Sequence, residues 1–349
     1  MAIKHMEVVG VRCLTPTLWG LDAGVNVVVG ENGAGKTSLL EAISLVCTGR
    51  TLRPGSSRGA ITHGQERLRV AARFGDGLEA GELVYERTRS LRVWRLNDGV
   101  LRSAAQAYER VPVMVFNPET HYAVLQDAHA RRAGMYWAMF HVEPLFLETW
   151  RRYQRLLRQR NAALRVHDAT YRLFEPGLIQ TGQVLAEFWR RTVETIGRPF
   201  VSLTERLGLG VIAEARWRPG WDGESLAEAL ERSRAGDERL GYTQVGPHRA
   251  DIVFEIRQRP IQEVASHGQQ KVIVNAWRLA VVQLVAESGR RALVLLDDLA
   301  AELDRRRRAA FYETLLALDL QVVVTAMEPE PLPSPVSMFH VEHGQLRGP

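Results

Sequence analysis

The segment Gly30–Thr37 combines glycines, a lysine and a threonine at the spacing of a phosphate-binding loop. Its sequence, GENGAGKT, fits the pattern G-x-x-x-x-G-K-[ST]. Glycines let the backbone wrap closely around a phosphate so that several N–H groups point at its oxygens. Lys36 can reach the β- and γ-phosphates, and the hydroxyl of Thr37 is a ligand for Mg²⁺. We therefore predict that the chain binds ATP with Mg²⁺, through Gly30, Glu31, Asn32, Gly33, Ala34, Gly35, Lys36, Thr37 and Ser38.

Two adjacent carboxylates, Asp297 and Asp298, end the apolar run Leu293–Leu296. A carboxylate at the tip of a strand beside a phosphate loop can hold Mg²⁺, directly or through water, and we assign this role to Asp297. Asp298 is then the candidate to polarise the attacking water. Two acids after an apolar strand are commonly only the start of a solvated loop, and the phosphate loop favours the catalytic interpretation. The predicted catalytic residues are Lys36, Asp297 and Asp298; the predicted metal ligands are Thr37 and Asp297.

A further anion site is predicted where a long amphipathic helix begins, near Ser266. Ser266 can cap this helix, and Gly268 permits close approach of another backbone. The free N–H groups at a helix start attract anions. An ordinary N-cap is the alternative interpretation. The predicted nucleotide contacts at this helix are Ser266, Gly268, Gln269 and Gln270.

Hydrophobic patterns on either side of these motifs predict the elements that must position them. An apolar strand at 24–29 precedes the phosphate loop, and a helix at 38–45 follows it. Strands are also predicted at 68–74, 82–88, 91–96, 111–116, 252–256, 293–296 and 321–324. A hairpin turn is predicted at Asn97-Asp98-Gly99 and a closing hairpin at 336–346. Helical periodicity predicts helices over most of 119–235, at 272–287 and at 305–318.

The alternation of strands and helices on both sides of a helical stretch predicts one α/β domain interrupted by an insertion. We expect an α/β head, with a mixed sheet and a parallel core around the phosphate loop, from residues 1–118 and 241–349. Residues 119–240 are expected to form a mostly helical arm. Such a fold places the phosphate loop and the paired acids in the head.

Composition limits the classes of function. The 349 residues carry 45 basic and 40 acidic side chains, a formal net charge of +5, which permits a polyanionic partner without requiring one. No apolar run approaches the roughly 20 residues of a membrane span, so we expect no membrane association and a cytoplasmic location. The cysteines, Cys13 and Cys47, form no CxxC pair, which argues against a thiolate zinc site.

Taken together, these segments resemble ATP-binding-cassette ATPases and, within that class, the RecF family of bacterial recombination mediators. The likeness covers nearly the whole chain. It includes the phosphate loop followed by SLLEAI, and it is most specific in GQQK at 268–271 and LLDDLAAELD at 295–304. The remaining stretches that carry it are Asn117-Pro118-Glu119, Arg158-Gln159-Arg160-Asn161 and Gly246-Pro247-His248-Arg249-Ala250-Asp251.

This resemblance implies an ABC-ATPase-like head that forms an ATP-dependent homodimer, with two nucleotides held between two heads. Ser266, Gly268 and Gln269 would then reach the γ-phosphate bound by the partner, and Ala301–Asp304 would lie near the dimer seam. It also implies a weak, DNA-stimulated ATPase that binds gapped DNA or single-to-double-strand junctions without reading sequence. RecR and RecO are the implied partners in loading the strand-exchange recombinase onto gapped single-stranded DNA.

The chain departs from related ATPases at several positions. Asp298 stands where cassette transporters and related repair ATPases usually have Glu, and the shorter acid fits slow hydrolysis. Thr325 follows the strand after which many cassette ATPases have His, so a histidine switch is in doubt. Arg131-Arg132 matches the family pattern loosely, and Asn117 is one guess for the residue that senses the γ-phosphate.

Arginines are the candidates for DNA contact, because their forks bind phosphates without reading sequence. A solvated helix face is the simpler interpretation for each of them. His248 and Asp251 lie in a Gly-Pro turn that is either structural or close to the nucleotide. The dense basic stretch consists of Arg151, Arg152, Arg155, Arg158 and Arg160.

Three other classes of function compete with this prediction. An ATPase subunit of a membrane transporter would, by family resemblance, have its serine-bearing helix much nearer both other motifs. A chromosome-organising ATPase would need a long coiled coil, and the insertion lacks sustained heptads. A non-catalytic ATP-binding scaffold would not need Lys36, Thr37, Asp297 and Asp298 together.

Overall fold

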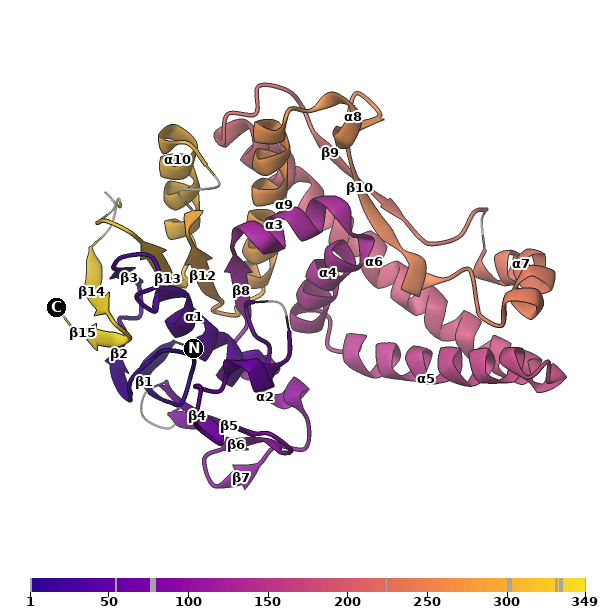
Figure 1. Ribbon diagram of the computed structural model, residues 1–349. Coiled ribbons are helices and arrows are strands. Elements are labelled where there is room, and N and C mark those ends of the chain that lie inside the picture. Colours follow the sequence, from indigo (N-terminus) through magenta and orange to yellow (C-terminus); the bar gives the residue numbers. More distant parts are fainter. Residues whose placement is uncertain are drawn as a thin grey trace. The chain divides into compact units, whose positions relative to one another are not determined.

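The structure, a computed structural model, describes residues 2–53, 55–75, 80–223, 225–299, 303–329, 332 and 335–348. The chain divides into two compact units (Figure 1). The first unit consists of Met1–His121 and Val285–Pro349, and the second of Tyr122–Leu284.

The phosphate-loop sheet of the first unit has the strand order β15-β14-β3-β13-β12-β8. Five strands run parallel and β15 pairs antiparallel with β14. β3, β12 and β13 are built almost wholly of buried residues, as expected for strands covered on both faces. The strands are β3 (Val25–Val29), β8 (Val113–Phe116), β12 (Leu293–Asp297), β13 (Gln321–Ala326), β14 (Val336–Glu342) and β15 (Gln345–Arg347).

A second, antiparallel sheet of this unit has the order β2-β1-β4-β5-β6-β7. The predicted turn joins β6 to β7, where Leu96 pairs with Gly99 and Asn97 takes a φ of 52°. Its strands are β1 (Ile3–Val9), β2 (Thr17–Gly20), β4 (Arg67–Phe74), β5 (Gly81–Thr88), β6 (Arg92–Leu96) and β7 (Gly99–Val100).

Helix α1 (Lys36–Thr48) joins the two sheets into one core. It contacts β4 and β5 of the antiparallel sheet and β8, β12 and β13 of the parallel sheet. Every residue from Ser38 to Cys47 is buried, so the start of α1 at the phosphate loop is held from both sides. The unit also contains α2 (Ala104–Arg110), α10 (Arg305–Leu316) and the 3₁₀ turn η1 (Ser57–Ala60).

The second unit is mostly helical, as predicted for the insertion. Its long helices α5 and α6 pack along one another (Figure 1). Tyr136, Phe146, Trp150 and Trp189 form an aromatic cluster between its helices. The helices are α4 (Ala128–Val142), α5 (Phe146–Arg165), α6 (Glu175–Arg206), α7 (Leu226–Leu240) and α8 (Ile261–Val264), with 3₁₀ turns η3 (Ala169–Phe174) and η4 (Pro247–Arg249). Two helices, α3 (Pro118–Gln126) and α9 (His267–Glu287), cross the limits between the units.

One sheet of the second unit differs from the predicted helical insertion. β9 (Glu214–Arg218) pairs with β10 (Asp251–Ile256), which also pairs with β11 (Arg259–Pro260). Phe200 of α6, Phe254 of β10 and Trp277 of α9 pack against one another. These contacts group residues 241–284 with the helices, so the compact units divide at 285 and not at 241.

No helix among the described residues is both long and apolar enough to cross a membrane.

Candidate nucleotide-binding site

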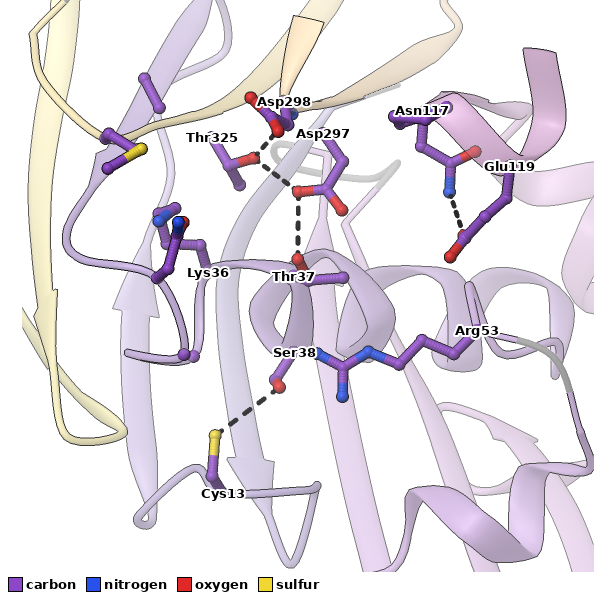
Figure 2. A pocket seen from close by; sticks show the side chains of 16 residues that line it. Cys13, Lys36, Thr37, Ser38, Arg53, Asn117, Glu119, Asp297, Asp298 and Thr325 are labelled. Carbon is purple, nitrogen blue, oxygen red and sulfur yellow. Dashed lines mark hydrogen bonds between the residues drawn. The ribbon is translucent and has the colours of Figure 1, made fainter. Parts of the chain in front are cut away.

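A cavity of about 430 Å³ opens beside the phosphate loop in the first unit (Figure 2). The loop and the start of α1 line one part of it. The other lining segments come from Asn117–Glu119 after β8, Asp297–Asp298 after β12 and Thr325–Met327 at the end of β13. Carboxyl ends of neighbouring parallel strands meet at one edge of a sheet, which brings these distant segments together.

The loop backbone adopts conformations that explain its glycines. β3 ends at Val29 and α1 begins at Lys36, as the sequence predicts. Gly33 and Gly35 have φ values of 81° and 119°, which residues with a Cβ rarely adopt. Open space surrounds the position of a Cβ on Gly33, so backbone conformation alone requires glycine there.

Lys36 is folded back onto its own loop. Its Nζ donates to the carbonyl oxygens of Gly30 at 2.6 Å and Glu31 at 2.9 Å. Burial lowers the pKa of Lys36, while the charges of Asp297 and Asp298 act in the opposite direction. Lys36, the glycine loop and the paired acids all line the same cavity.

Thr37 and Asp297, the two predicted metal ligands, face each other in the cavity. The hydroxyl of Thr37 donates to Oδ1 of Asp297 at 3.2 Å (Figure 2). Mg²⁺ takes oxygen ligands of this kind, usually one or two carboxylates completed by water and substrate phosphate. A hydroxyl and a carboxylate facing each other beside a phosphate loop fit that ion.

Thr325 lies beside the two acids, because β13 pairs with β12 and Thr325 is the register partner of Asp297. Its Oγ1 donates to Oδ1 of Asp297 at 2.6 Å and accepts from the backbone N–H of Asp298 at 3.3 Å. Asp298 is exposed, with a φ of 53°. Such a left-handed residue carries backbone strain that its surroundings must hold.

Asn117, the candidate γ-phosphate sensor, makes local structural bonds. Its Oδ1 accepts from the N–H of Thr120 at 2.8 Å, which caps the start of α3. Its Nδ2 donates to Oε2 of Glu119 at 3.2 Å, and both residues line the cavity (Figure 2).

The predicted serine-bearing site lies in the second unit, at the start of α9. The N–H of Gln269 donates to Oγ of Ser266 at 3.3 Å, and the N–H of Ser266 donates to Oε1 of Gln269 at 2.9 Å. These reciprocal bonds form a capping box. Nε2 of Gln270 donates to the carbonyl of Ala265 at 3.0 Å. Within one chain, therefore, the ordinary N-cap is the observed arrangement, and Gly268 lies in its first turn. Residues 301 and 302 of the predicted seam segment lie outside the described residues.

Two cavity residues had no signal in the sequence. Arg53 lies in a Gly-, Ser- and Arg-rich loop, and its side chain reaches toward Ser38 (Figure 2). Cys13 precedes the second strand, and its Sγ lies 3.7 Å from Oγ of Ser38. Each belongs to a segment with no recognisable motif, so only the fold places them beside the phosphate loop.

The structure corrects the candidacy of Arg160 for DNA contact. Its side chain is fully buried and bonds to Asp237 at 2.8 Å and Glu175 at 2.9 Å. A buried, paired guanidinium cannot reach a DNA backbone, and losing it would remove the ion pair of the buried carboxylate of Asp237. Arg151, Arg152, Arg155 and Arg158 are exposed, as the prediction requires.

The Gly-Pro turn at 246–247 has a structural role. His248 bonds to the hydroxyl of Tyr153 at 2.7 Å and to the carbonyl of Thr243 at 3.2 Å. Asp251 accepts two bonds from the guanidinium of Arg131, each 2.8 Å long. The Arg131-Arg132 pair therefore holds the start of β10, since Arg132 also donates to the carbonyl of Ala250.

Known proteins resemble this chain along its whole length. The model of a family described as "AAA domain" matches residues 10–99. The DNA replication and repair protein RecF of Thioalkalivibrio sulfidiphilus is 37% identical, over 99% of this chain and 99% of that protein. The RecF protein of Stenotrophomonas maltophilia is 36% identical, with 99% of each chain covered.

Solved structures share the fold. One, of the recombination mediator protein RecF with ATP in the RecFOR pathway, has a TM-score of 0.87 at 19% identity and covers 99% of this chain and 97% of that one. An Smc head bound to the C-winged helix domain of ScpA has a TM-score of 0.61 at 13% identity, with 99% and 96% covered. The fold class expected from the motifs is thus confirmed, and by its identity to relatives over their full length the chain belongs to the RecF family of DNA replication and repair proteins.

Proposed function

We propose that this protein is an ATP-dependent DNA-binding protein of recombinational repair and replication-gap processing, with slow ATP hydrolysis. The observation that carries the proposal is the convergence of Lys36, Thr37 and Asp297 on one cavity beside the glycine loop. The names of its relatives, which are DNA replication and repair proteins, support the biological setting.

The roles of the residues follow from their chemistry. Loop N–H groups and Lys36 would bind the phosphates, while Thr37 and Asp297 would hold Mg²⁺, which neutralises charge on the transferred phosphoryl group. Asp298 would orient the attacking water. The side chain of Asp298 is one methylene shorter than that of glutamate, so its carboxylate would lie farther from the attacking water, which supports slow turnover.

A dimer is the proposed working form. ATP would close two heads into a clamp, with Ser266, Gly268 and Gln269 of each chain facing the nucleotide of the other, and hydrolysis would open it. The positive end of α9 suits a terminal phosphate.

Gapped DNA, RecR and RecO are the proposed partners in loading a strand-exchange recombinase. Support comes from the RecFOR pathway named for the solved relative and from a basic stripe on α5. The stripe comprises Arg151, Arg155, Arg158 and Arg165, which recur at steps of four, three and seven residues and so share one helix face about 21 Å long. All four are exposed, and no carboxylate of the described residues is paired with any of them in an ion pair.

Phosphate release by the full chain tests the ATPase proposal. We expect slow release from ATP with Mg²⁺, faster release with gapped DNA, and loss of activity and of nucleotide affinity in Lys36→Met. Lys4→Met is the matched control, because Lys4 lies on β1 and does not line the cavity. Equal rates for the native chain and Lys36→Met would mean that a contaminant hydrolyses the ATP.

The same experiment addresses the alternative of a non-catalytic scaffold. A scaffold would bind ATP tightly and release no phosphate above the Lys36→Met background. The transporter alternative finds no support among the relatives, whose full length is covered by this chain and whose names refer to DNA replication and repair.

A further inference from the structure

The C-terminal hairpin of the chain lies against the phosphate loop. β14 runs parallel to β3 until His340 meets Val29, where β3 turns into the loop. The hairpin continues beyond that point, and its two-residue turn, His343–Gly344, has positive φ at both residues. The hairpin therefore lies beside a loop that is more than three hundred residues earlier in the sequence.

Gly344 bonds to two segments at once. Its N–H donates to the carbonyl of Ala34 at 2.8 Å, and its own carbonyl accepts from the N–H of Thr15 at 3.0 Å and the hydroxyl of Thr15 at 3.2 Å. The segment 12–15, which contains Thr15, is also attached to α1, because Arg12 forms an ion pair with the buried Glu41 of that helix. The hairpin tip, the 12–15 segment and the phosphate loop therefore form one bonded layer.

The bond to Ala34 determines which way a loop N–H points. In a trans peptide the carbonyl and the N–H point in opposite directions. Because the Ala34 carbonyl faces Gly344, the N–H of Gly35 faces away from the hairpin. Backbone N–H groups fixed in this way are what a phosphate loop offers its ligand.

The packing leaves no room for a side chain at these contacts. A Cβ on Gly344 would lie 2.1 Å from the carbonyl oxygen of Cys13, and a Cβ on Gly30 would lie 2.3 Å from that of Val341. A Cβ on Gly35 would lie 3.5 Å from Cα of Gly344. The hydrogen bond from Gly344 to Ala34 links the hairpin tip to the loop, so a shift of the tip displaces the loop.

We infer that the β14–β15 hairpin is a brace that preorganises the phosphate loop, and that Gly344 is a positioning residue for nucleotide binding. The inference rests on the proposed nucleotide site and adds a requirement to it. Gly344 touches no substrate; it acts through Ala34 and Thr15.

Gly344→Ala in the full chain tests the brace. We expect its dissociation constants for ADP and ATP to rise by about tenfold or more, because a misplaced binding group is costly. Gly289→Ala is the matched control: its φ of 81° is similar to the 77° of Gly344, but open space surrounds the new Cβ. Native affinity in Gly344→Ala, or an equal loss in Gly289→Ala, would overturn the inference.

Amide hydrogen exchange of the native chain provides a second test that does not depend on a variant folding. Coupling between two sites is reciprocal, so ADP bound at the loop should slow exchange in the segment 341–346 as well as in 30–37. Protection of 30–37 alone would contradict the brace and leave the nucleotide site intact. If ADP protects neither segment and does not bind, the proposed function itself fails.

Discussion

At the scale of single residues, Thr325 stands out because it bridges the two acids of the proposed catalytic site. The sequence raised it only as a residue where related ATPases have histidine. In the structure it is 2% exposed, and its one hydroxyl bonds to Asp297 and to the backbone of Asp298. Thr325 therefore holds the positions of both carboxyl-bearing residues.

Replacing this hydroxyl should weaken catalysis more than binding. Thr325→Val keeps the shape of the side chain but removes the bonds from Thr325 to the N–H of Asp298 and to Oδ1 of Asp297, so we expect kcat to fall by about tenfold. The concentration of Mg²⁺ at half-maximal activity should rise, and nucleotide affinity measured without Mg²⁺ should stay unchanged. Thr325→Ser restores the hydroxyl and should recover most of the rate; a native kcat in Thr325→Val would disprove the role.

His248 is a partly buried base with both ring nitrogens engaged. Nε2 must donate to the carbonyl of Thr243, and in the neutral ring Nδ1 then accepts from the hydroxyl of Tyr153. Burial, aided by the charges of Arg249 and Arg132, lowers the pKa of His248 from 6.5 to about 4. Between about pH 4 and pH 6.5, the His248 ring therefore binds a proton in the unfolded chain but not in the folded chain.

This difference predicts a loss of stability in mild acid. Stability should fall as the pH drops from about 6.5 towards 4, by on the order of 1–3 kcal/mol for this one group. Urea unfolding at pH 7 and pH 5, followed by tryptophan fluorescence, measures the change. His248→Gln cannot titrate, so its stability should depend less steeply on pH; the same slope in both chains would contradict the assignment.

At the scale of elements, α5 combines a buried face with the basic stripe. Tyr153, Leu157 and Leu164 face the interior of the second unit, and Arg160 lies among them with its ion pairs. The arginines of the stripe recur on the other side of the helix. Helical periodicity thus separates the arginine that stabilises the unit from those available to a polyanion.

DNA binding through this stripe should depend strongly on salt. Each phosphate contact releases counterions, so affinity for gapped DNA should fall steeply with salt, and Arg155→Ala and Arg158→Ala should each reduce the slope of log affinity against log salt by about one. Arg190→Ala is the control, because Arg190 is an exposed arginine of α6 already paired with Glu187 and Glu194. Equal affinity at low and high salt would exclude phosphate contact.

At the scale of the whole molecule, the predicted site is divided between two compact units. The phosphate loop and the paired acids belong to the first unit, and the serine-bearing helix start belongs to the second. The cavity described above is lined by the first unit alone. In the proposed dimer, a second chain would supply the serine-bearing helix start that covers the nucleotide.

Light scattering should detect this second chain. With ATP and Mg²⁺ we expect twice the monomer mass, and with ADP a smaller share of dimer. Ser266→Arg should block the dimer without preventing nucleotide binding. Ser225→Arg is the matched control, because Ser225 also caps a helix, α7, through the N–H of Glu228. A native chain that stays monomeric with ATP and Mg²⁺ would exclude the cross-subunit site.

The sequence by itself determined the features that are encoded in consecutive residues. The phosphate loop specifies its own backbone through Gly33 and Gly35, and the buried strands on either side of the helical part are apparent from continuous apolar runs. The elements around the site, the turn at Asn97 and the closing hairpin were all predictable in this way. The resemblance to a known family then predicted the fold class, because several of these motifs occur in the same order along the chain as in that family.

Only the tertiary structure decided which distant segments meet. Strand order places Thr325 beside the paired acids, and it places the C-terminal hairpin beside the phosphate loop. Hydrophobic periodicity carries no information on strand order. Burial of Arg160 depends on carboxylates from α6 and α7, so a local basic stretch could not reveal it. Likewise β9 is a strand because β10 pairs with it, since a short, mostly exposed segment has little strand signal of its own.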